Sequence, residues 1–105
     1  MSNQTQTARV KPIAATQTTI YNLSMPSANT EYSQSLSNST KAILVKTRDR
    51  TARVQIAFVS GDTDLLYVTI EPGAVYFKEN LDLTGATIFV QANKSSQVCE
   101  IQEWT

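Results

Sequence analysis

From residue 41 onward the chain is a nearly unbroken series of short β-type runs, which Gly, Pro, Asn and Asp residues separate from one another. Residues 53–59 (RVQIAFV) show the pattern best, because Val54, Ile56 and Phe58 alternate with polar or small neighbours and so share one face of a strand. Residues 71–74 (EPGA) place Pro and Gly where a type II turn requires them. No helical period lasts longer than a turn. The sequence therefore predicts an all-β domain, a small antiparallel β-sandwich or jelly roll, with almost no helix.

The first 40 residues differ from this body in composition. They contain 22 Ser, Thr, Asn or Gln residues and a single acidic residue, Glu31. Residues 1–17 lack sustained periodicity and contain Pro12, so we expect an extended N-terminal arm there. Residues 18–25 (TTIYNLSM) alternate and predict the first strand. The β-sandwich domain is therefore expected over residues 18–105.

The expected core consists of the apolar side chains that we expect to point inward from the predicted strands. They are Ile43, Val45, Val54, Ile56, Phe58, Leu66, Val68, Ile70, Val75, Phe77, Leu83, Ile88, Val90, Val98 and Ile101. A body of about 80 residues buries only roughly 60% of the surface that its unfolded chain exposes. A core of this size leaves little margin of stability, which favours a homo-oligomer or a multi-copy subunit of a larger assembly.

Several strands are apolar on both faces, because Leu44, Tyr67, Tyr76 and Phe89 have the parity opposite to the expected core. Two interpretations are open. Either the inward assignment is wrong in some strands or loops cover these side chains, or they form an exposed patch that binds another protein copy. The candidate interface consists of these four residues, two basic residues of the arm and the tryptophan near the C-terminus. The full set is Arg9, Lys11, Leu44, Tyr67, Tyr76, Phe89 and Trp104.

The formal charge is zero, with nine basic and nine acidic residues, so no global charge favours nucleic acid or an anionic membrane as a partner. Locally, the basic residues of segment 41–53 are offset by Asp49 alone. Such a segment either meets acidic surfaces of neighbouring copies or forms solvated strand edges that carry Lys and Arg against aggregation. We expect neither a nucleic-acid partner nor a membrane span, and we expect no signal peptide because the N-terminus lacks an apolar region.

The residue types that most often perform catalysis are scarce. Histidine is absent, and Cys99, the lone cysteine, is expected to be a small core residue. Asp62 and Asp64 share one loop but offer too few oxygen donors for a calcium site. Glu100 and Glu103 are expected on opposite faces of one strand, so they cannot act as a pair. The expectation is a protein with no catalytic site, no metal and no cofactor.

Four pieces of the chain, taken in order, resemble a family of small virion proteins from tailed bacteriophages. The pieces are NTEYSQSL (29–36), FVSG (58–61), YVTIEPGAVYFKENLDLTGATIFVQA (67–92) and SQVCEIQEWT (96–105). The resemblance implies a capsid-associated or neck-associated structural subunit with a β-sandwich body and no enzyme activity.

We therefore expect a capsid decoration (cement) protein, made in the bacterial host cytoplasm and located in the virion. Its partners would be the major capsid protein or other virion subunits, and the arm would cross adjacent capsid subunits. One alternative is a head–tail adaptor, or a neck or tail-associated ring component. A second is a glycan-binding or host-surface-binding module that uses Trp104 with the loops at 60–64 (SGDTD) and 93–96 (NKSS).

Overall fold

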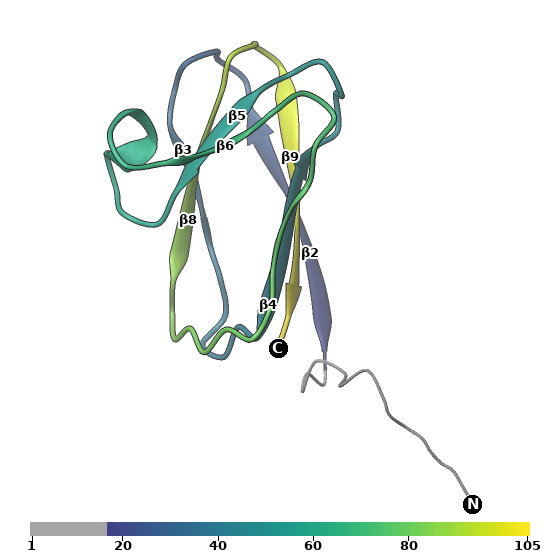
Figure 1. The fold of residues 1–105 in the computed structure, drawn as a ribbon, viewed down its shortest axis with the longest axis vertical. Coiled ribbons are helices and arrows are strands. Elements are labelled where there is room, and N and C mark those ends of the chain that lie inside the picture. The colour runs from purple at the N-terminus through teal and green to yellow at the C-terminus, as the bar shows by residue number, and fades with distance from the viewer. Residues whose placement is uncertain (1–16) are drawn as a thin grey trace, which may run out of the picture.

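Residues 17–105 are described by a computed structural model, in which strands dominate (Figure 1). The elements, in chain order, are β2 (Thr18–Met25), β3 (Tyr32–Ser35), β4 (Ala42–Thr47), β5 (Val54–Ala57), the short 3-10 helix η1 (Asp62–Asp64), β6 (Val68–Ile70), β7 (Tyr76–Lys78), β8 (Thr87–Ala92) and β9 (Gln97–Trp104). The predicted arm over residues 1–17 lies, except for Gln17, outside the described residues.

The strands form two four-stranded sheets. The first sheet has the order β2-β9-β4-β7 and the second has the order β3-β8-β5-β6. All strand pairings within residues 17–105 are antiparallel. Four of them join β2 with β9, β3 with β8, β4 with β7, and β5 with β6, and two more join β4 with β9 and β5 with β8 inside the sheets. The chain therefore resembles one long hairpin, closed at the β5–β6 connection and rolled so that successive strand pairs fall alternately in the two sheets. This is jelly-roll topology, and the prediction of an all-β antiparallel sandwich is confirmed.

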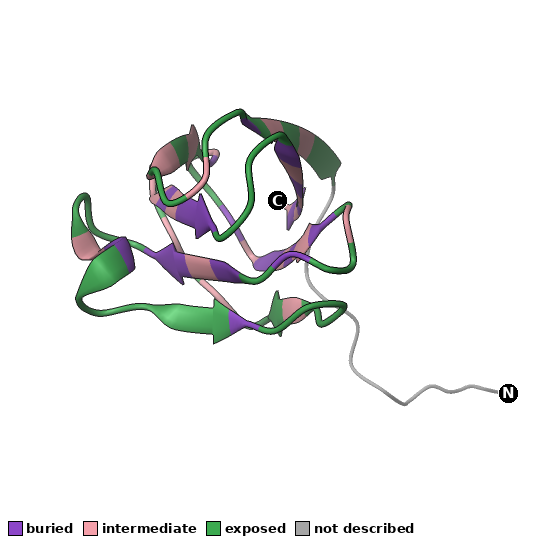
Figure 2. Ribbon diagram, turned by 90° about the horizontal axis from the view of Figure 1, so that it is seen from above, coloured by how far each residue is buried: buried purple, intermediate pink, exposed green. Residues whose placement is uncertain are grey.

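The core lies between the two sheets, where strand alternation turns one face of each sheet inward (Figure 2). In β9 every second residue is buried, which places Cys99 and Ile101 in the core and confirms the role expected for Cys99. The fully or nearly fully buried apolar cluster is Met25, Leu36, Ile43, Val45, Val54, Ile56, Ile70, Ile88, Val90, Ala92, Cys99 and Ile101.

Five residues of the expected core are instead exposed. They are Phe58, Leu66, Val68, Val75 and Phe77. Strand β5 ends at Ala57, so the chain has already left the sheet at Phe58 and the alternation no longer applies. Val68 lies opposite Ile56 on β6, but this three-residue edge strand leaves it partly open to solvent. Leu83 is half-buried. Val98 is also half-buried, but the alternation of β9 buries Cys99 and Ile101 and places Val98 on the outer face, so its predicted inward position is wrong.

The register of β7 explains why the predicted faces of Tyr76 and Phe77 were both wrong. Tyr76 lies opposite Val45, and directly opposed residues of an antiparallel pair project from the same face. Tyr76 therefore faces inward and packs against the core, whereas Phe77, opposite Leu44, faces outward. A three-residue strand has too short a pattern to reveal its parity, so the pairing with β4 decides it.

Candidate functional site

The β5–β6 connection projects from the second sheet and carries η1 (Figure 1). It exposes a group of large apolar side chains that we call the apolar tip: Phe58, Val59, Leu65, Leu66, Tyr67 and Val68. Leu65 is 73% exposed and Leu66 is 77% exposed. A concentration of exposed apolar side chains on one loop marks an interaction site more often than scattered single residues do.

The local backbone of the apolar tip is well satisfied by hydrogen bonds. Gly61 adopts a φ of 87°, which allows the chain to turn back at the start of η1. The Asp62 N–H donates to the Val59 carbonyl at 3.1 Å, and the N–H groups of Leu65 and Leu66 both donate to the Asp62 carbonyl at 3.0 Å. These bonds close the turn and leave both leucine side chains exposed to solvent.

Glu31, from the connection before β3, attaches the apolar tip to the body. Its carboxylate accepts hydrogen bonds from the Gly61 N–H at 3.0 Å and from the Thr63 hydroxyl at 2.8 Å. The bond from the Gly61 N–H, followed by the one from the Thr63 hydroxyl, lowers the pKa of the Glu31 carboxyl below its usual value. A charged acceptor makes these bonds stronger than neutral ones.

A second set of bonds fastens η1 to the outer side of the second sheet. The buried Gln91 of β8 donates from Nε2 to Asp64 Oδ1 at 3.0 Å and to Gln55 Oε1 at 3.2 Å. The Thr63 hydroxyl, also buried, lies 3.1 Å from Gln91 Oε1. Asp64 therefore helps to attach the loop to the sheet, and hydrogen bonds to Glu31 and Gln91 fix the position of η1 at the base of the apolar tip.

Two hollows adjoin the apolar tip. One, of about 290 Å³, is shallow and lies among the tip residues and the end of β5. The other, also about 290 Å³, opens between the sheets beside β7, and its lining is almost wholly apolar: Ile43, Phe58, Tyr76, Lys78, Leu81, Leu83 and Ala86. Phe58 lines both hollows, so the apolar tip is continuous with the opening of the sandwich.

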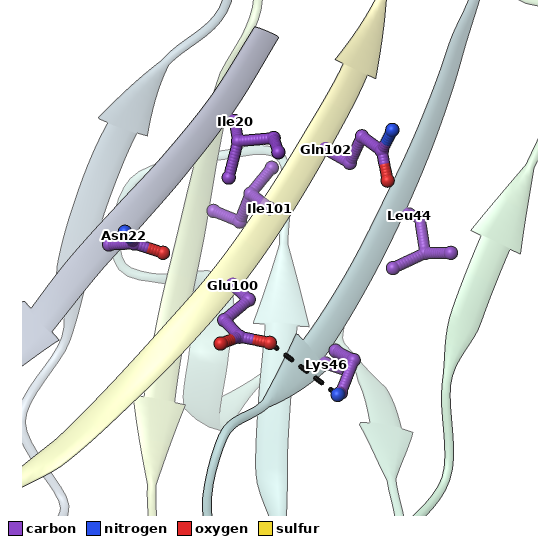
Figure 3. Close-up of a pocket in the computed structure, with 7 residues that line it drawn as sticks. All are labelled: Ile20, Asn22, Leu44, Lys46, Glu100, Ile101 and Gln102. Carbon is purple, nitrogen blue, oxygen red and sulfur yellow. Dashed lines mark ion pairs between the residues drawn. The ribbon is translucent and has the colours of Figure 1, made fainter. Parts of the chain in front are cut away.

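The outer face of the first sheet carries a second apolar group, in which Ile20 and Phe77 are exposed and Leu44 and Trp104 are half-buried. The rings of Phe77 and Trp104 meet edge to face, with centroids 5.8 Å apart. A hollow of about 230 Å³ lies across β2, β9 and β4, and Ile20 and Leu44 border it from opposite sides (Figure 3).

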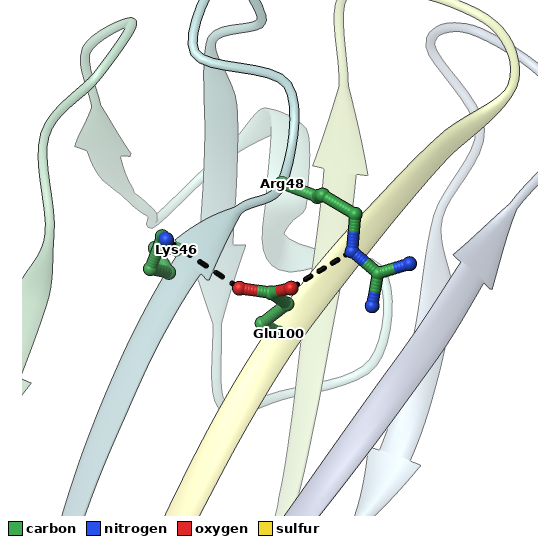
Figure 4. Close-up of polar contacts among 3 residues, drawn as sticks. All are labelled: Lys46, Arg48 and Glu100. Carbon is green, nitrogen blue, oxygen red and sulfur yellow. Dashed lines mark hydrogen bonds and ion pairs between the residues drawn. The ribbon is translucent and has the colours of Figure 1, made fainter.

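At one end of this hollow Glu100 lies between two cations of β4 and the loop after it (Figure 4). Its carboxylate is 2.8 Å from Arg48 Nε and 3.4 Å from Lys46 Nζ. The hydrogen bond from Arg48, then the one from Lys46 and the charge of both, lowers the pKa of the Glu100 carboxyl. Two of the basic residues in segment 41–53 are therefore balanced by an acidic residue of the same chain.

Glu103 of β9 is a charged residue that is 0% exposed. Its Oε1 accepts from the Tyr21 hydroxyl at 2.7 Å, and its Oε2 accepts from the Ser37 N–H and the Ser37 hydroxyl, both at 2.9 Å, and from the Thr40 hydroxyl. Burial raises the pKa of this carboxyl, but the bonds from Thr40, Tyr21 and Ser37 lower it by more, so the pKa lies below the ordinary value of 4.5.

The same bond raises the pKa of Tyr21 to about 12, because a phenolate would lose the hydrogen that it shares with Glu103 and would face a second negative charge. The network joins β2, β9 and the β3–β4 loop. Glu100 and Glu103 lie on opposite faces of β9, as expected from the alternation of the strand.

The candidate interface residues do not form one surface. Leu44 and Trp104 lie on the outer face of the first sheet, whereas Tyr67 belongs to the apolar tip and Phe89 lies on the outer side of the second sheet. Tyr76 faces the core, and its predicted outward position is wrong. Arg9 and Lys11 lie outside the described residues.

Sequence reasoning missed the exposure of Leu65 and Leu66, the most exposed large apolar side chains of the described residues. A usable signal was the run LLYVTI (65–70), whose consecutive apolar residues cannot all face inward in one strand. Within residues 17–105 no group of three His, Cys, Asp or Glu side chains is placed to hold a metal ion. A search of the same residues finds no helix of the length and apolar character needed to cross a membrane.

Comparisons with known proteins bear on the fold alone. No family model and no curated protein sequence matches this chain. Among solved structures, the chain is similar to a de novo designed double-stranded β-helix whose structure was determined by NMR in solution. The TM-score is 0.51 at 14% sequence identity, over 86% of this chain and 100% of the designed chain. At this identity the likeness concerns the two-sheet architecture only.

Proposed function

We propose that this chain is a structural subunit of a tailed-bacteriophage particle, specifically a capsid decoration (cement) protein that docks on the shell through the apolar tip. The proposal rests on the resemblance of residues 29–105 to small phage virion proteins and on one structural observation. That observation is an apolar surface exposed on a loop whose backbone is held by hydrogen bonds to Glu31 and Gln91.

A pre-ordered tip favours docking because association then costs little further conformational entropy. Leu65, Leu66 and Val59 are each more than half exposed, so a partner surface would remove much of their area from water. Full burial of such a side chain contributes about 1.5–3 kcal/mol, and the exposed fraction of these three corresponds to roughly 3–6 kcal/mol before the cost of association. Contacts of this size, repeated over many copies, would add to the stability of a shell.

The polar groups with displaced pKa values support a structural rather than a catalytic role. Glu31 holds the apolar tip, while Tyr21 and Glu103 bond to each other in the interior. Each is fully engaged in joining segments that are distant in the chain. The proposal therefore includes no enzymatic activity and no cofactor.

The experiment compares the double variant Leu65→Ser/Leu66→Ser with the control Val75→Ser, which removes an exposed apolar side chain elsewhere. Both proteins are added to purified particles that lack this chain, and occupancy is measured by co-sedimentation. Both should keep the wild-type melting curve, because the substituted side chains lie in solvent. The tip variant should lose occupancy and the control should keep it; equal occupancy of the two would refute docking through the tip.

The number of copies per particle separates this proposal from its alternatives within the particle. A decoration protein would be present in numbers on the order of hundreds, whereas a head–tail adaptor or a tail-associated ring would contain about six or twelve copies in closed cyclic symmetry. Quantitative mass spectrometry of purified particles measures this number. A glycan-binding role gains no support from loop 60–64, because Thr63 and Asp64 bond to groups within the chain.

A further inference from the structure

Among the described residues, strand β2 forms a long edge of the first sheet. It pairs with β9 over all eight of its residues on one side, and within residues 17–105 no strand pairs with its other side. The other edge strands are much shorter, with four residues in β3 and three each in β6 and β7. An unpaired edge of this length presents a row of backbone donors and acceptors that another strand can use.

Natural sheets protect such edges with charged side chains, proline or bulges. Residues 18–25 (TTIYNLSM) contain none of these, since the strand has no charged residue, no proline and no glycine, and its register with β9 is uninterrupted. Pro26 comes only after the strand has ended. Ile20, in the middle of the edge, is 65% exposed and borders the hollow on the outer face of the sheet.

The backbone directions along this edge follow from two hydrogen bonds. The Thr105 N–H donates to the Gln17 carbonyl at 2.9 Å, and the Arg48 N–H donates to the Val98 carbonyl at 3.0 Å. Backbone groups alternate in direction along a strand, so odd positions of β9 face β2 and even positions face β4. By the same alternation, the N–H and C=O groups of the even positions of β2 (18, 20, 22 and 24) point to the free edge.

We propose that β2 pairs antiparallel with β2 of a second copy, about a two-fold axis at Tyr21, to form one continuous eight-stranded sheet. In this register position 18 of one copy lies opposite position 24 of the other, and position 20 lies opposite position 22. No other register gives each edge N–H and C=O group of these four positions a partner among the same four positions of the second copy. The strand carries no charge, so self-pairing brings no like charges together.

The outward-facing side chains of β2 are also compatible with a second copy of the chain at this edge. Ile20 of each copy comes to lie diagonally across the axis from its counterpart, and the two outer-face hollows, each bordered by Ile20 and Leu44, become neighbours. A second copy of the chain is thus complementary to this edge in backbone, charge and apolar surface. The contact is separate from the apolar tip, which lies on the other sheet, and it does not depend on the proposed function.

The test is sedimentation equilibrium of the full chain over a concentration series, with variants at position 22. The wild type should pass from the 11.6 kDa monomer to the dimer as concentration rises. Asn22→Pro removes one edge N–H without touching the bonds to β9, and it should weaken dimerisation at least tenfold. Asn22→Ala keeps that N–H and should dimerise like the wild type.

Circular dichroism establishes that the variants are folded. If Asn22→Pro does not fold, Ile20→Lys takes its place as the edge variant, because it brings a lysine of each copy together across the axis and should also weaken dimerisation. Amide exchange gives a direct readout: the N–H groups at positions 18, 20, 22 and 24 should exchange more slowly as the dimer forms. A chain that stays monomeric at about millimolar concentration, or a folded edge variant that dimerises like the wild type, would overturn the proposal. Protection of these amides in the monomer would also overturn it, because residues 1–16 of the same chain would then cover the edge.

Discussion

Replacing Glu103 by Gln tests whether the buried carboxylate holds the sandwich together. Gln offers one carbonyl oxygen, and this must take the position of Oε2, because the Ser37 N–H can only donate. The side-chain NH₂ then faces the Tyr21 hydroxyl, which has to turn its hydrogen away. The hydroxyls of Ser37 and Thr40 keep an acceptor, but all four bonds lose the assistance of the negative charge.

The magnitude follows from these four bonds. A hydrogen bond to a charged group contributes about 1.5–3 kcal/mol and a neutral one about 0.5–1.5 kcal/mol, so each bond loses roughly 1 kcal/mol. The neutral amide is less costly to bury than the carboxylate, which offsets part of the loss. We expect the free energy of unfolding to fall by about 2–4 kcal/mol. At about 4–8 °C per kcal/mol for a domain of this size, the melting temperature should fall by roughly 10–25 °C.

Glu100→Gln is the matched control, since it makes the same chemical change on the opposite face of the same strand. It breaks two ion pairs with exposed partners, and such pairs contribute about 0–1 kcal/mol. Urea unfolding followed by circular dichroism measures both variants against the wild type. If Glu103→Gln loses no more stability than Glu100→Gln, the network does not stabilise the fold and the reasoning fails.

Three further predictions concern pH, the thiol and the apolar tip. Folding lowers the pKa of Glu103, so the stability that Glu103 contributes is present above the unfolded pKa of 4.5 and is lost as pH falls through the folded pKa. Folding raises the pKa of Tyr21, so the stability that Tyr21 contributes is present below pH 10 and is lost as pH rises through about 12. Urea titrations should therefore show stability declining on both sides of this window, and unchanged stability at pH 3 would contradict the assignment. Burial raises the pKa of the Cys99 thiol to about 12, so a disulfide reagent should label it only in denaturant, and labelling of the native protein would show that β9 opens. Glu31→Ala should speed amide exchange at Gly61 by about tenfold or more, from the loss of a charge-assisted bond, with little change in the melting temperature; unchanged exchange would mean that Glu31 does not hold the tip.

In the central strands β4, β5 and β8, sequence alternation located the core correctly. Residues 43 and 45 of β4, 54 and 56 of β5, and 88 and 90 of β8 are buried as predicted, because each of these strands has neighbours on both sides and one face against the opposite sheet. The prediction failed in and beside the short edge strands, and it also failed at Val98, which lies on the outer face of the central strand β9. Tyr76 and Phe77 exchanged faces because three residues cannot reveal a period of two.

The groups of the candidate site were less accessible to sequence reasoning than the core. The apolar tip was missed because residues 65–67 have the composition of a strand. The hydrogen bonds that hold the preceding turn outside the sheet join Thr63 to Glu31 and Gln91, which are distant in the chain. The position of Glu103 on the buried side of β9 follows from its parity with Cys99 and Ile101. Its partners do not, since Tyr21, Ser37 and Thr40 lie more than sixty positions away in the chain.

The sequence by itself determined the properties that depend on neighbouring residues: an all-β class, the positions of the main turns, a body without histidine, and a lone cysteine at a buried parity. The tertiary structure alone decided which strands lie at the edges, which of two apolar faces is covered, and which side chains surround the buried carboxylate of Glu103. The physical reason is that a strand is satisfied only by partners distant in the chain. Pairing such as that of β2 with β9 therefore determines which surfaces remain open for contact with other molecules.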